Sequence, residues 1–314
     1  MVIWIAIALI LSRVGSWGGG WRIGVNSEQF LRPNSGLIQR NGSSKRLGGK
    51  TPVIQDLKAL VWGGLVAIVG GLIGVGGAEF RIPVLAKVFH YRPLPMVIIN
   101  LMISLVTVTF SLVFRSGVIE LETVIAHGGI ILNLLCGSLL GSYLGVRYAT
   151  AIPEEALRRV IVVFLVVLSL VLLGHHFILG LVGWTMPRGL QVVVGVLAGL
   201  VIGLFSSLLG VAGGELLIPT ITLVFGVDIR LAGSLSLVIS LFTILMGLGK
   251  YQSQGAFVRV RKDGRFILFM ALGSAIGAGI GGYLLRYVTS DFIYIILGLV
   301  LLGSAWKLSQ EEGD

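Results

Sequence analysis

One ten-residue stretch occurs twice in the chain and carries the residues best suited to chemistry. The first copy reads GVGGAEFRIP over residues 74–83, and the second reads GVAGGELLIP over residues 210–219. The two copies lie 136 residues apart, with no gap between matched positions. Each copy holds clustered glycines, one carboxylate and one proline. The sequence therefore predicts a duplicated module.

The carboxylates are Glu79 and Glu215, which hold the same place in the two copies. A glutamate at membrane depth is costly and usually faces a partner, a cavity or an ion path, which makes both residues candidates for proton coupling. Alternatively, each carboxylate accepts from freed backbone N–H groups at the start of a short helix and complements its dipole. Both interpretations stay open.

Glycine and proline both oppose a continuous helix, so we expect each copy to interrupt one, with Pro83 and Pro219 as helix-breaking residues. Exposed N–H groups at the start of the next helix bind anions without any charged side chain. Two such starts brought together would suit a small oxyanion. The backbone candidates for this contact are Gly74, Gly76, Gly77, Ala78, Gly210, Gly213 and Gly214. Alternatively, the small residues only allow two helices to pack closely.

Polar side chains follow each copy and could complete such a site. Asn100 lies in the first half, and Ser234 and Ser236 lie in the second. The pairs Asn100-Leu101 and Ser234-Leu235 occupy similar places before their apolar runs. These side chains could donate to an anion, or they could bond across helices or to their own backbone.

The composition indicates a polytopic membrane protein. Hydrophobic residues make up 55% of the chain, charged residues only 12%, and the mean hydropathy is +0.98. Soluble proteins have about a quarter of their residues charged. The net charge of +10 comes from Lys and Arg in short connections between apolar runs, which argues against nucleic acid as a partner. The expected partners are a small anionic substrate and the lipid bilayer, and a homo-oligomer is left open.

No residue pattern favours an enzyme. The sequence has no Cys/His metal spacing, no P-loop lysine and no nucleophile elbow. The only cysteine, Cys136, lies in an apolar run, so no intrachain disulfide is expected. We therefore expect no catalytic residues, no cofactor and no metal.

The expected fold is all-α, with two homologous four-span halves that each contain a broken or re-entrant half-helix at the glycine-rich motif. Residues 1–51 form a short apolar N-terminal helix, over residues 1–11, and a flexible basic tail. The first repeat covers residues 52–180 and the second covers residues 181–314. The eight apolar runs cover residues 57–73, 95–114, 124–146, 157–173, 189–209, 231–248, 266–285 and 292–308. Two shorter apolar pieces, residues 80–89 and 216–225, are half-helices because ten residues span about half the hydrocarbon core.

The duplication extends beyond the motif. GSLLGSYLG at residues 137–145 matches GSAIGAGIG at residues 273–281, again at an offset of 136. Glycine at every fourth position falls on one helix face, so we expect these faces to pack closely against other helices.

Charge counting favours a cytoplasmic C-terminus. The loop over residues 250–265 carries five basic residues and should be cytoplasmic. With four spans per half, Arg115 and Arg188 fall on that same side, and the repeats are parallel. If the half-helices cross the membrane, each half has five spans and the repeats are inverted.

The twin Gly-x-Gly-Gly-x-Glu-x-x-x-Pro pattern, the two halves and the basic loop containing Gln252-Ser253-Gln254-Gly255 resemble the TauE/SafE family, also called the toluene sulfonate uptake permease family. The resemblance covers roughly residues 57–308. It implies a multi-pass permease of the cytoplasmic membrane that moves small sulfur-containing anions such as sulfite or sulfonates, coupled to protons. The family motif often reads Gly-x-Gly-Gly-Gly. Here Ala78 and Ala212 each replace one glycine.

The sequence thus favours a secondary transporter for a small sulfur oxyanion or organosulfonate, with the substrate held between the two motifs. One alternative is a passive anion channel in which the half-helices form a filter. Another is a membrane scaffold or partner subunit that does not transport.

Overall fold

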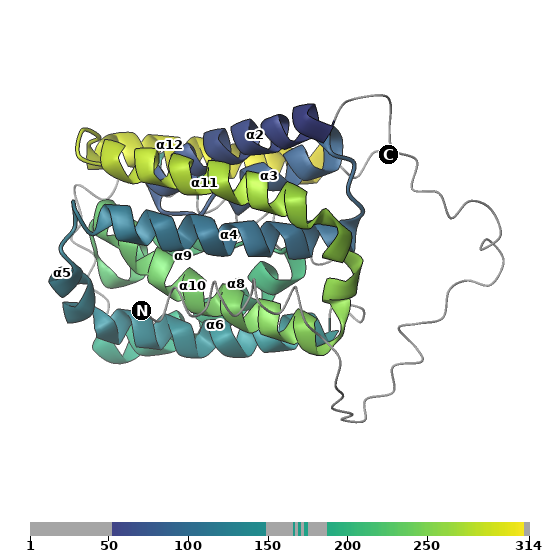
Figure 1. The fold of residues 1–314 in the computed structure, drawn as a ribbon. Helices are drawn as coiled ribbons and strands as arrows, with labels where there is room; N and C mark the ends of the chain where they lie inside the picture. The colour runs from purple at the N-terminus through teal and green to yellow at the C-terminus, as the bar shows by residue number, and fades with distance from the viewer. Residues whose placement is uncertain (1–51, 149–165, 167–168, 171–172, 175–186, 311–314) are drawn as a thin grey trace. The chain divides into compact units, whose positions relative to one another are not determined.

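The computed structural model describes residues 52–148, 166, 169–170, 173–174 and 187–310, and the elements in these ranges are helical (Figure 1). The expected N-terminal helix, the basic tail and most of the expected span over residues 157–173 lie outside the described residues. Residues 56–314 form one compact unit.

Seven long helices make up most of the described chain, and six of them are long and apolar enough to cross a membrane. The six are α2 (Pro52–Ile73), α4 (Pro93–Arg115), α6 (Gly128–Tyr148), α8 (Arg188–Leu209), α10 (Ile229–Ser253) and α11 (Gly264–Leu284). The seventh, α12 (Ser290–Gln310), has a shorter apolar portion, Ser290–Val300. The short elements are α3 (Ala78–Pro83), the π-helix η1 (Val84–Val88), α5 (Leu121–Ala126), α9 (Gly214–Phe225) and the 3₁₀ turns η3 (Ala256–Arg259) and η4 (Arg261–Asp263).

The expected span over residues 124–146 is two helices rather than one. Helix α5 ends at Ala126, and α6 starts at Gly128 after His127. Two adjacent glycines, Gly128 and Gly129, follow the histidine, and glycine disfavours a helix interior.

Several contacts define one end of the helix bundle, which we call the basic end. Asp56 near the start of α2 pairs with Arg265 near the start of α11 at 2.6 Å. Phe89, just after η1, stacks against Phe266 with ring centroids 4.7 Å apart. Lys250 near the end of α10 lies over the ring of Tyr143 near the end of α6.

The loop that starts α4 is also held at the basic end. The Tyr91 hydroxyl donates to an Asp263 carboxylate oxygen at 3.1 Å. Burial, together with the neighbouring Asp263 carboxylate, raises the pKa of Tyr91, so the phenol stays protonated and remains a donor.

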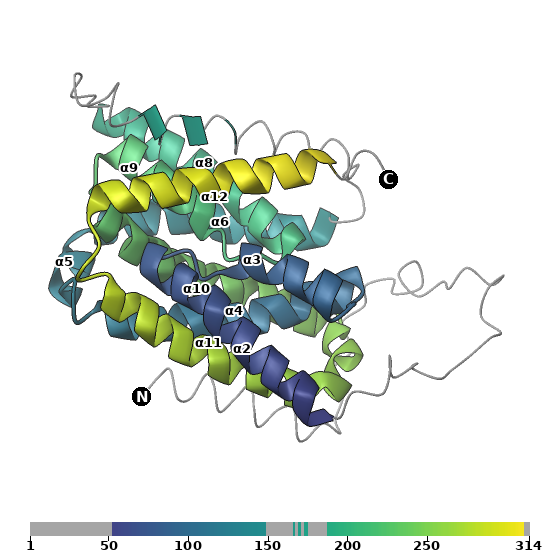
Figure 2. The same ribbon diagram turned by 90° about the horizontal axis from the view of Figure 1, so that it is seen from above.

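The opposite end is defined in the same way. Arg115 at the end of α4 donates to the carbonyl of Leu72, near the end of α2, and to that of Arg230, near the start of α10. The Ser290 hydroxyl at the start of α12 donates to Asp228, just before α10. Thus α2, α4 and α11 run from the basic end to the opposite end, and α6, α10 and α12 run back (Figures 1 and 2).

The glycine faces pack against backbone, as expected. A Cβ atom built on each of these glycines would fall against main-chain or side-chain atoms of the neighbouring helix. On α6 the glycines face α8, in the pairs Gly137–Val196, Gly141–Leu200 and Gly145–Leu204; on α11 they face α2, in the pairs Gly273–Leu60, Gly277–Gly64 and Gly281–Ile68. Residue numbers rise together in each pair of helices, so α8 runs parallel to α6, and α11 runs parallel to α2.

The same contacts recur at the offset found in the sequence. Every residue in the α6–α8 pairs has its counterpart 136 residues away in the α11–α2 pairs. Each glycine face therefore packs against the first long helix of the other half. In this way α6 packs against α8, and α11 packs against α2, which is far from it in the sequence.

Each motif interrupts the chain between a long helix and a short one. Gly74, Gly76 and Gly77 have φ values of 98°, 78° and 70° between α2 and α3, and Gly210 and Gly213 have φ values of 68° and 75° between α8 and α9. These left-handed conformations favour glycine and end a right-handed helix. The α3–η1 segment then leads back to the basic end, and α9 leads back to the opposite end.

Because these segments turn back, two arginines lie at the end opposite to the one that the sequence predicts. The sequence placed Arg115 and Arg188 with the basic loop, but both lie at the opposite end. The charge count expects each half-helix to return the chain to the side where the preceding long helix ends. In the structure, the α3–η1 segment instead leads the chain back to the basic end before α4 begins.

Candidate functional site

The two interruptions touch each other. A Cβ atom built on Gly76 would lie 3.3 Å from the Cβ of Ala212, and these residues hold the same place in the two motifs. A Cβ on Gly214 would lie 2.6 Å from the Cα of Val75, where no methyl group fits. The structure thus brings Gly76 against Ala212 and Gly214 against the backbone of Val75, so that the two motifs are in direct contact.

Asn100 and Ser236 join each interruption to the long helix of the other half. The Asn100 amide donates to the carbonyl of Gly210 at 2.9 Å and to that of Ala78 at 3.1 Å. The Ser236 hydroxyl donates to the carbonyl of Gly74 at 2.7 Å. Asn100 and Ser236 are 136 residues apart, as are Gly74 and Gly210. Side chains at equivalent positions thus donate to equivalent carbonyls of the two interruptions. Without them these carbonyls would be buried without a donor.

The guanidinium group of Arg81 lies at the centre of a polar cluster on α4. It donates to the side chains of Asn100 at 3.1 Å, Ser104 at 2.9 Å and Thr107 at 3.0 Å. It also reaches the carbonyls of Asn100 and Gly76 at 3.5 Å. Arg81 is fully buried and its Nε has no partner. Every one of these acceptors is neutral, so the guanidinium charge has no carboxylate bonded to it.

The two motif glutamates lie in the first turns of the short helices. Glu79 is in the first turn of α3, and Glu215 is in the first turn of α9. Both carboxylate oxygens of Glu79 and Oε1 of Glu215 are buried without a hydrogen-bond partner on another residue. The Glu79 carboxylate lies within electrostatic range of both Arg81 and Glu215. The Glu79 carboxylate therefore lies in a cluster with one buried cation, Arg81, and a second buried acid, Glu215.

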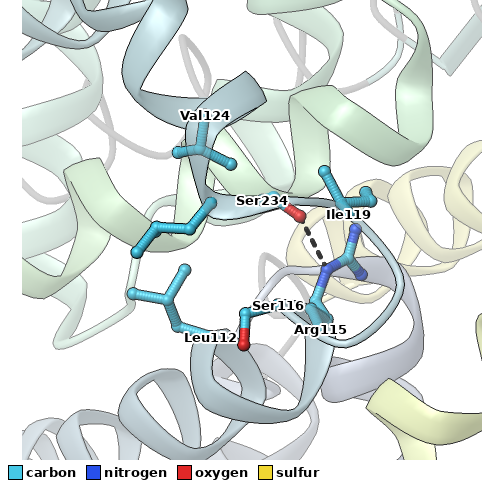
Figure 3. Close-up of a pocket in the computed structure, with 7 residues that line it drawn as sticks. Leu112, Arg115, Ser116, Ile119, Val124 and Ser234 are labelled. Carbon is cyan, nitrogen blue, oxygen red and sulfur yellow. Dashed lines mark hydrogen bonds between the residues drawn. The ribbon is translucent and has the colours of Figure 1, made fainter.

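Ser234 lies apart from this cluster, toward the opposite end. Its hydroxyl accepts from Arg115 Nε at 3.1 Å, and both residues line a small cavity (Figure 3). The cavity walls are otherwise mostly aliphatic, with Leu112 and Val124 among them. The Ser234 hydroxyl thus bonds to Arg115 rather than to a motif carbonyl, and Ser236 is the residue equivalent to Asn100.

Arg115 and Tyr251 donate hydrogen bonds to backbone carbonyls near the end of the long helix before each interruption. Arg115 donates to the carbonyl of Gly71 at 3.1 Å, and the Tyr251 hydroxyl donates to that of Ser207 at 3.1 Å. Arg115 and Tyr251 are 136 residues apart, and so are Gly71 and Ser207. The carbonyls freed at the end of a helix are in this way satisfied by side chains of a neighbouring helix.

The prolines do not lie at the interruptions. Pro83 is the last residue of α3, where the π-helix η1 takes over, and Pro219 lies inside α9, which continues to Phe225. Proline lacks an N–H, so neither can bond to the carbonyl four residues earlier, which belongs to Glu79 or Glu215. The φ of proline is compatible with a helix, so the cost is one hydrogen bond rather than a break.

Reasoning from the sequence missed three groups in this region. Arg81 has the apolar Leu217 as its counterpart, so the duplicated pattern does not indicate it, and it does not indicate the roles of Arg115 and Tyr251 either. The offset of 136 pairs Asn100 with Ser236 and could have corrected the alignment with Ser234. Nothing in the sequence shows which carbonyls these side chains reach. In the described residues, no group of three or more metal-ligating side chains gathers.

Comparison with known proteins identifies the family. The model of the family described as sulfite exporter TauE/SafE matches residues 1–172 and 195–312. No curated protein and no solved structure matches the chain. The match covers most of the sequence, and the six apolar helices agree with a multi-pass membrane protein. The chain belongs to the sulfite exporter TauE/SafE family, a family of membrane transporters for sulfur anions.

Proposed function

We propose that this protein is a secondary transporter for a small sulfur oxyanion or organosulfonate, and that the substrate is held where the two interrupted segments meet. The observation that carries the proposal is the direct contact between Gly76 and Ala212, at equivalent places of the two motifs. Discontinuous helices that meet at the interface of two repeats form the substrate site in several transporter folds. Because the segments are in contact, an anion enters only when they separate.

We further propose that the two halves, residues 52–180 and 181–314, are inverted repeats with re-entrant short helices. Three sets of contacts related by the offset of 136 support this: the glycine faces, the pair Asn100 and Ser236, and the pair Arg115 and Tyr251. Helix α2 starts at the basic end, whereas its counterpart α8 starts at the other. A two-fold axis in the membrane plane relates segments in this way.

Proton coupling would come from Glu79 and Glu215. Buried carboxylates without hydrogen-bond donors are costly when ionised, so proton binding is strongly favoured wherever no other charge compensates. A proton taken up by either glutamate removes a negative charge from the path of an anion. Anion flux should therefore rise as the pH on the substrate side falls.

Transport in proteoliposomes tests the proposal. Radiolabelled sulfite should be exchanged for internal sulfite, because counterflow marks a carrier and is absent from an open channel. Replacing both glutamates, E79Q with E215Q, should leave flux that no longer varies with pH. A wild-type protein that exchanges none of sulfite, thiosulfate, sulfate and methanesulfonate would overturn the proposed function. Unchanged pH dependence in the double variant would remove the glutamates from coupling.

A further inference from the structure

We propose that Arg81 is the cationic group that binds the anion, and that the anion binds together with protons on Glu79 and Glu215. The inference rests on the transport function proposed above and deepens it. It assigns the charge that recognises the substrate to a single residue of the first motif. It also names the favoured ligand class, a singly charged oxyanion such as a sulfonate.

Arg81 lies between the two interruptions. Its guanidinium contacts the carbonyl of Gly76, which lies against Ala212 of the second motif. It also contacts Asn100, whose amide reaches the carbonyl of Gly210. The group is thus linked by direct contacts to both motifs, and it is held in one orientation by three side chains of α4.

The buried guanidinium charge of Arg81 is not neutralised by a bonded carboxylate. All the hydrogen-bond acceptors of Arg81 are neutral, its Nε is unpartnered, and the nearby Glu79 oxygens are unpartnered too. A buried charge is normally paired. A guanidinium group is also the side chain best suited to an oxyanion, because its planar N–H groups match two oxygens at once.

The two short helical segments differ in charge. Helix α3 continues directly into the π-helix η1, so the α3–η1 segment (Ala78–Val88) and α9 (Gly214–Phe225) are of similar length. Arg81 lies on α3, and its counterpart on α9 is the apolar Leu217. The first motif therefore carries a cationic side chain that the second motif lacks.

The charge balance of the cluster then fixes the role of the protons. With both glutamates ionised, the cluster of Arg81, Glu79 and Glu215 carries one net negative charge and repels an anion. With both protonated it carries one positive charge, which a monovalent anion neutralises. A low-dielectric interior strongly disfavours an unbalanced charge. Anion binding should therefore take up protons and strengthen as pH falls.

The other charged residues around the cluster lie at or near the ends of their helices. Apart from Glu79, Arg81 and Glu215, the helices that surround it carry charged residues only in their first two turns or last turn, or next to their first residue: Asp56, Lys58, Arg92, Arg115, Arg188, Asp228, Arg230 and Lys250.

Anion binding to the purified full-length protein tests the inference, with radiolabelled methanesulfonate as the monovalent probe and sulfate as the divalent one. R81Q removes the charge and keeps a neutral side chain with two N–H donors, and should weaken methanesulfonate binding by about tenfold to a hundredfold. R81K keeps the charge without the planar donors and should lose less. R286Q removes an exposed arginine at the opposite end and should bind as the wild type does.

A second readout does not depend on any substitution. Adding methanesulfonate to the unbuffered wild-type protein near neutral pH should cause net proton uptake, and E79Q should reduce the number of protons per anion. Wild-type binding that is unchanged in folded R81Q, binding without proton uptake, or a preference for sulfate would each overturn the role of Arg81 and leave the proposed function standing. A wild-type protein that binds neither probe nor sulfite or thiosulfate would overturn both.

Discussion

At the scale of residues, Asn100 and Ser236 show how an interrupted helix is accommodated inside an apolar protein. Each interruption frees a buried carbonyl, at Gly74 or Gly210, and one side chain from the other half donates to it. Leaving such a group without a partner costs about 1–3 kcal/mol. The polar side chains next to the motifs therefore stabilise the conformation that the glycines permit.

Replacing Asn100 by alanine removes the donor for two buried carbonyls, those of Gly210 and Ala78. We expect N100A to lower the free energy of unfolding by about 2–6 kcal/mol, which is twice the cost of one unpaired group. S236A removes one donor and should cost about half as much. Thermal unfolding of the detergent-purified variants measures both. N133A is the matched control, because the Asn133 amide makes one exposed bond of 3.3 Å; an equal loss in N133A would contradict the expectation.

The sequence indicated these residues but not what they contact. Asn100 and Ser236 were predicted to lie near the motifs, and they do. Asn100 donates to Gly210 and Ser236 donates to Gly74, which lie 110 and 162 residues away in the other half, and no local spacing reveals such a contact. The contacts of Arg81 with α4 cannot be read from the sequence either, because they form only when the chain folds back.

At the scale of elements, glycine decides where helices stop and how closely they pack. The left-handed glycines end α2 and α8, and the glycine faces of α6 and α11 let two pairs of helices meet backbone to backbone. Both features could be predicted from the sequence, since clustered glycine disfavours a helix and glycine at every fourth position lies on one face. The prolines were a weaker guide, because Pro219 sits inside a helix that continues past it.

Adding a single methyl group to a glycine face should separate the paired helices. A Cβ at Gly141 would fall against the carbonyl of Leu200, and one at Gly277 would fall against that of Gly64. We expect G141A and G277A each to destabilise the protein by about 1–3 kcal/mol, the usual cost of overpacking. Thermal unfolding checks this, with G129A as control because a Cβ there has nothing within 4 Å. Wild-type stability in both variants would mean that the faces are loosely packed.

At the scale of the whole molecule, the return of the short helices gives a strong asymmetry of charge. Among the residues that the structure describes, ten basic residues lie at or near the basic end: Lys58, Lys87, Arg92, Arg147, Lys250, Arg259, Arg261, Lys262, Arg265 and Lys307. Four of the described basic residues lie at the opposite end: Arg115, Arg188, Arg230 and Arg286. The count from the sequence alone gives a smaller difference in basic residues between the two sides, because the sequence does not show the direction of each helix after the motifs. An excess of Lys and Arg favours the cytoplasmic side, so the basic end should be cytoplasmic.

The account depends on the short helices turning back inside the membrane, so that the two interruptions meet and α4 starts at the end where α2 began. Single cysteines at exposed positions, S116C and Q254C in a C136A background, test this with a membrane-impermeant thiol reagent on intact cells. The loop after α4 should face outward, so S116C should react directly. Q254C should react only after the membrane is permeabilised. Labelling of both cysteines from the same side would contradict the returning helices and, with them, the meeting of the two motifs.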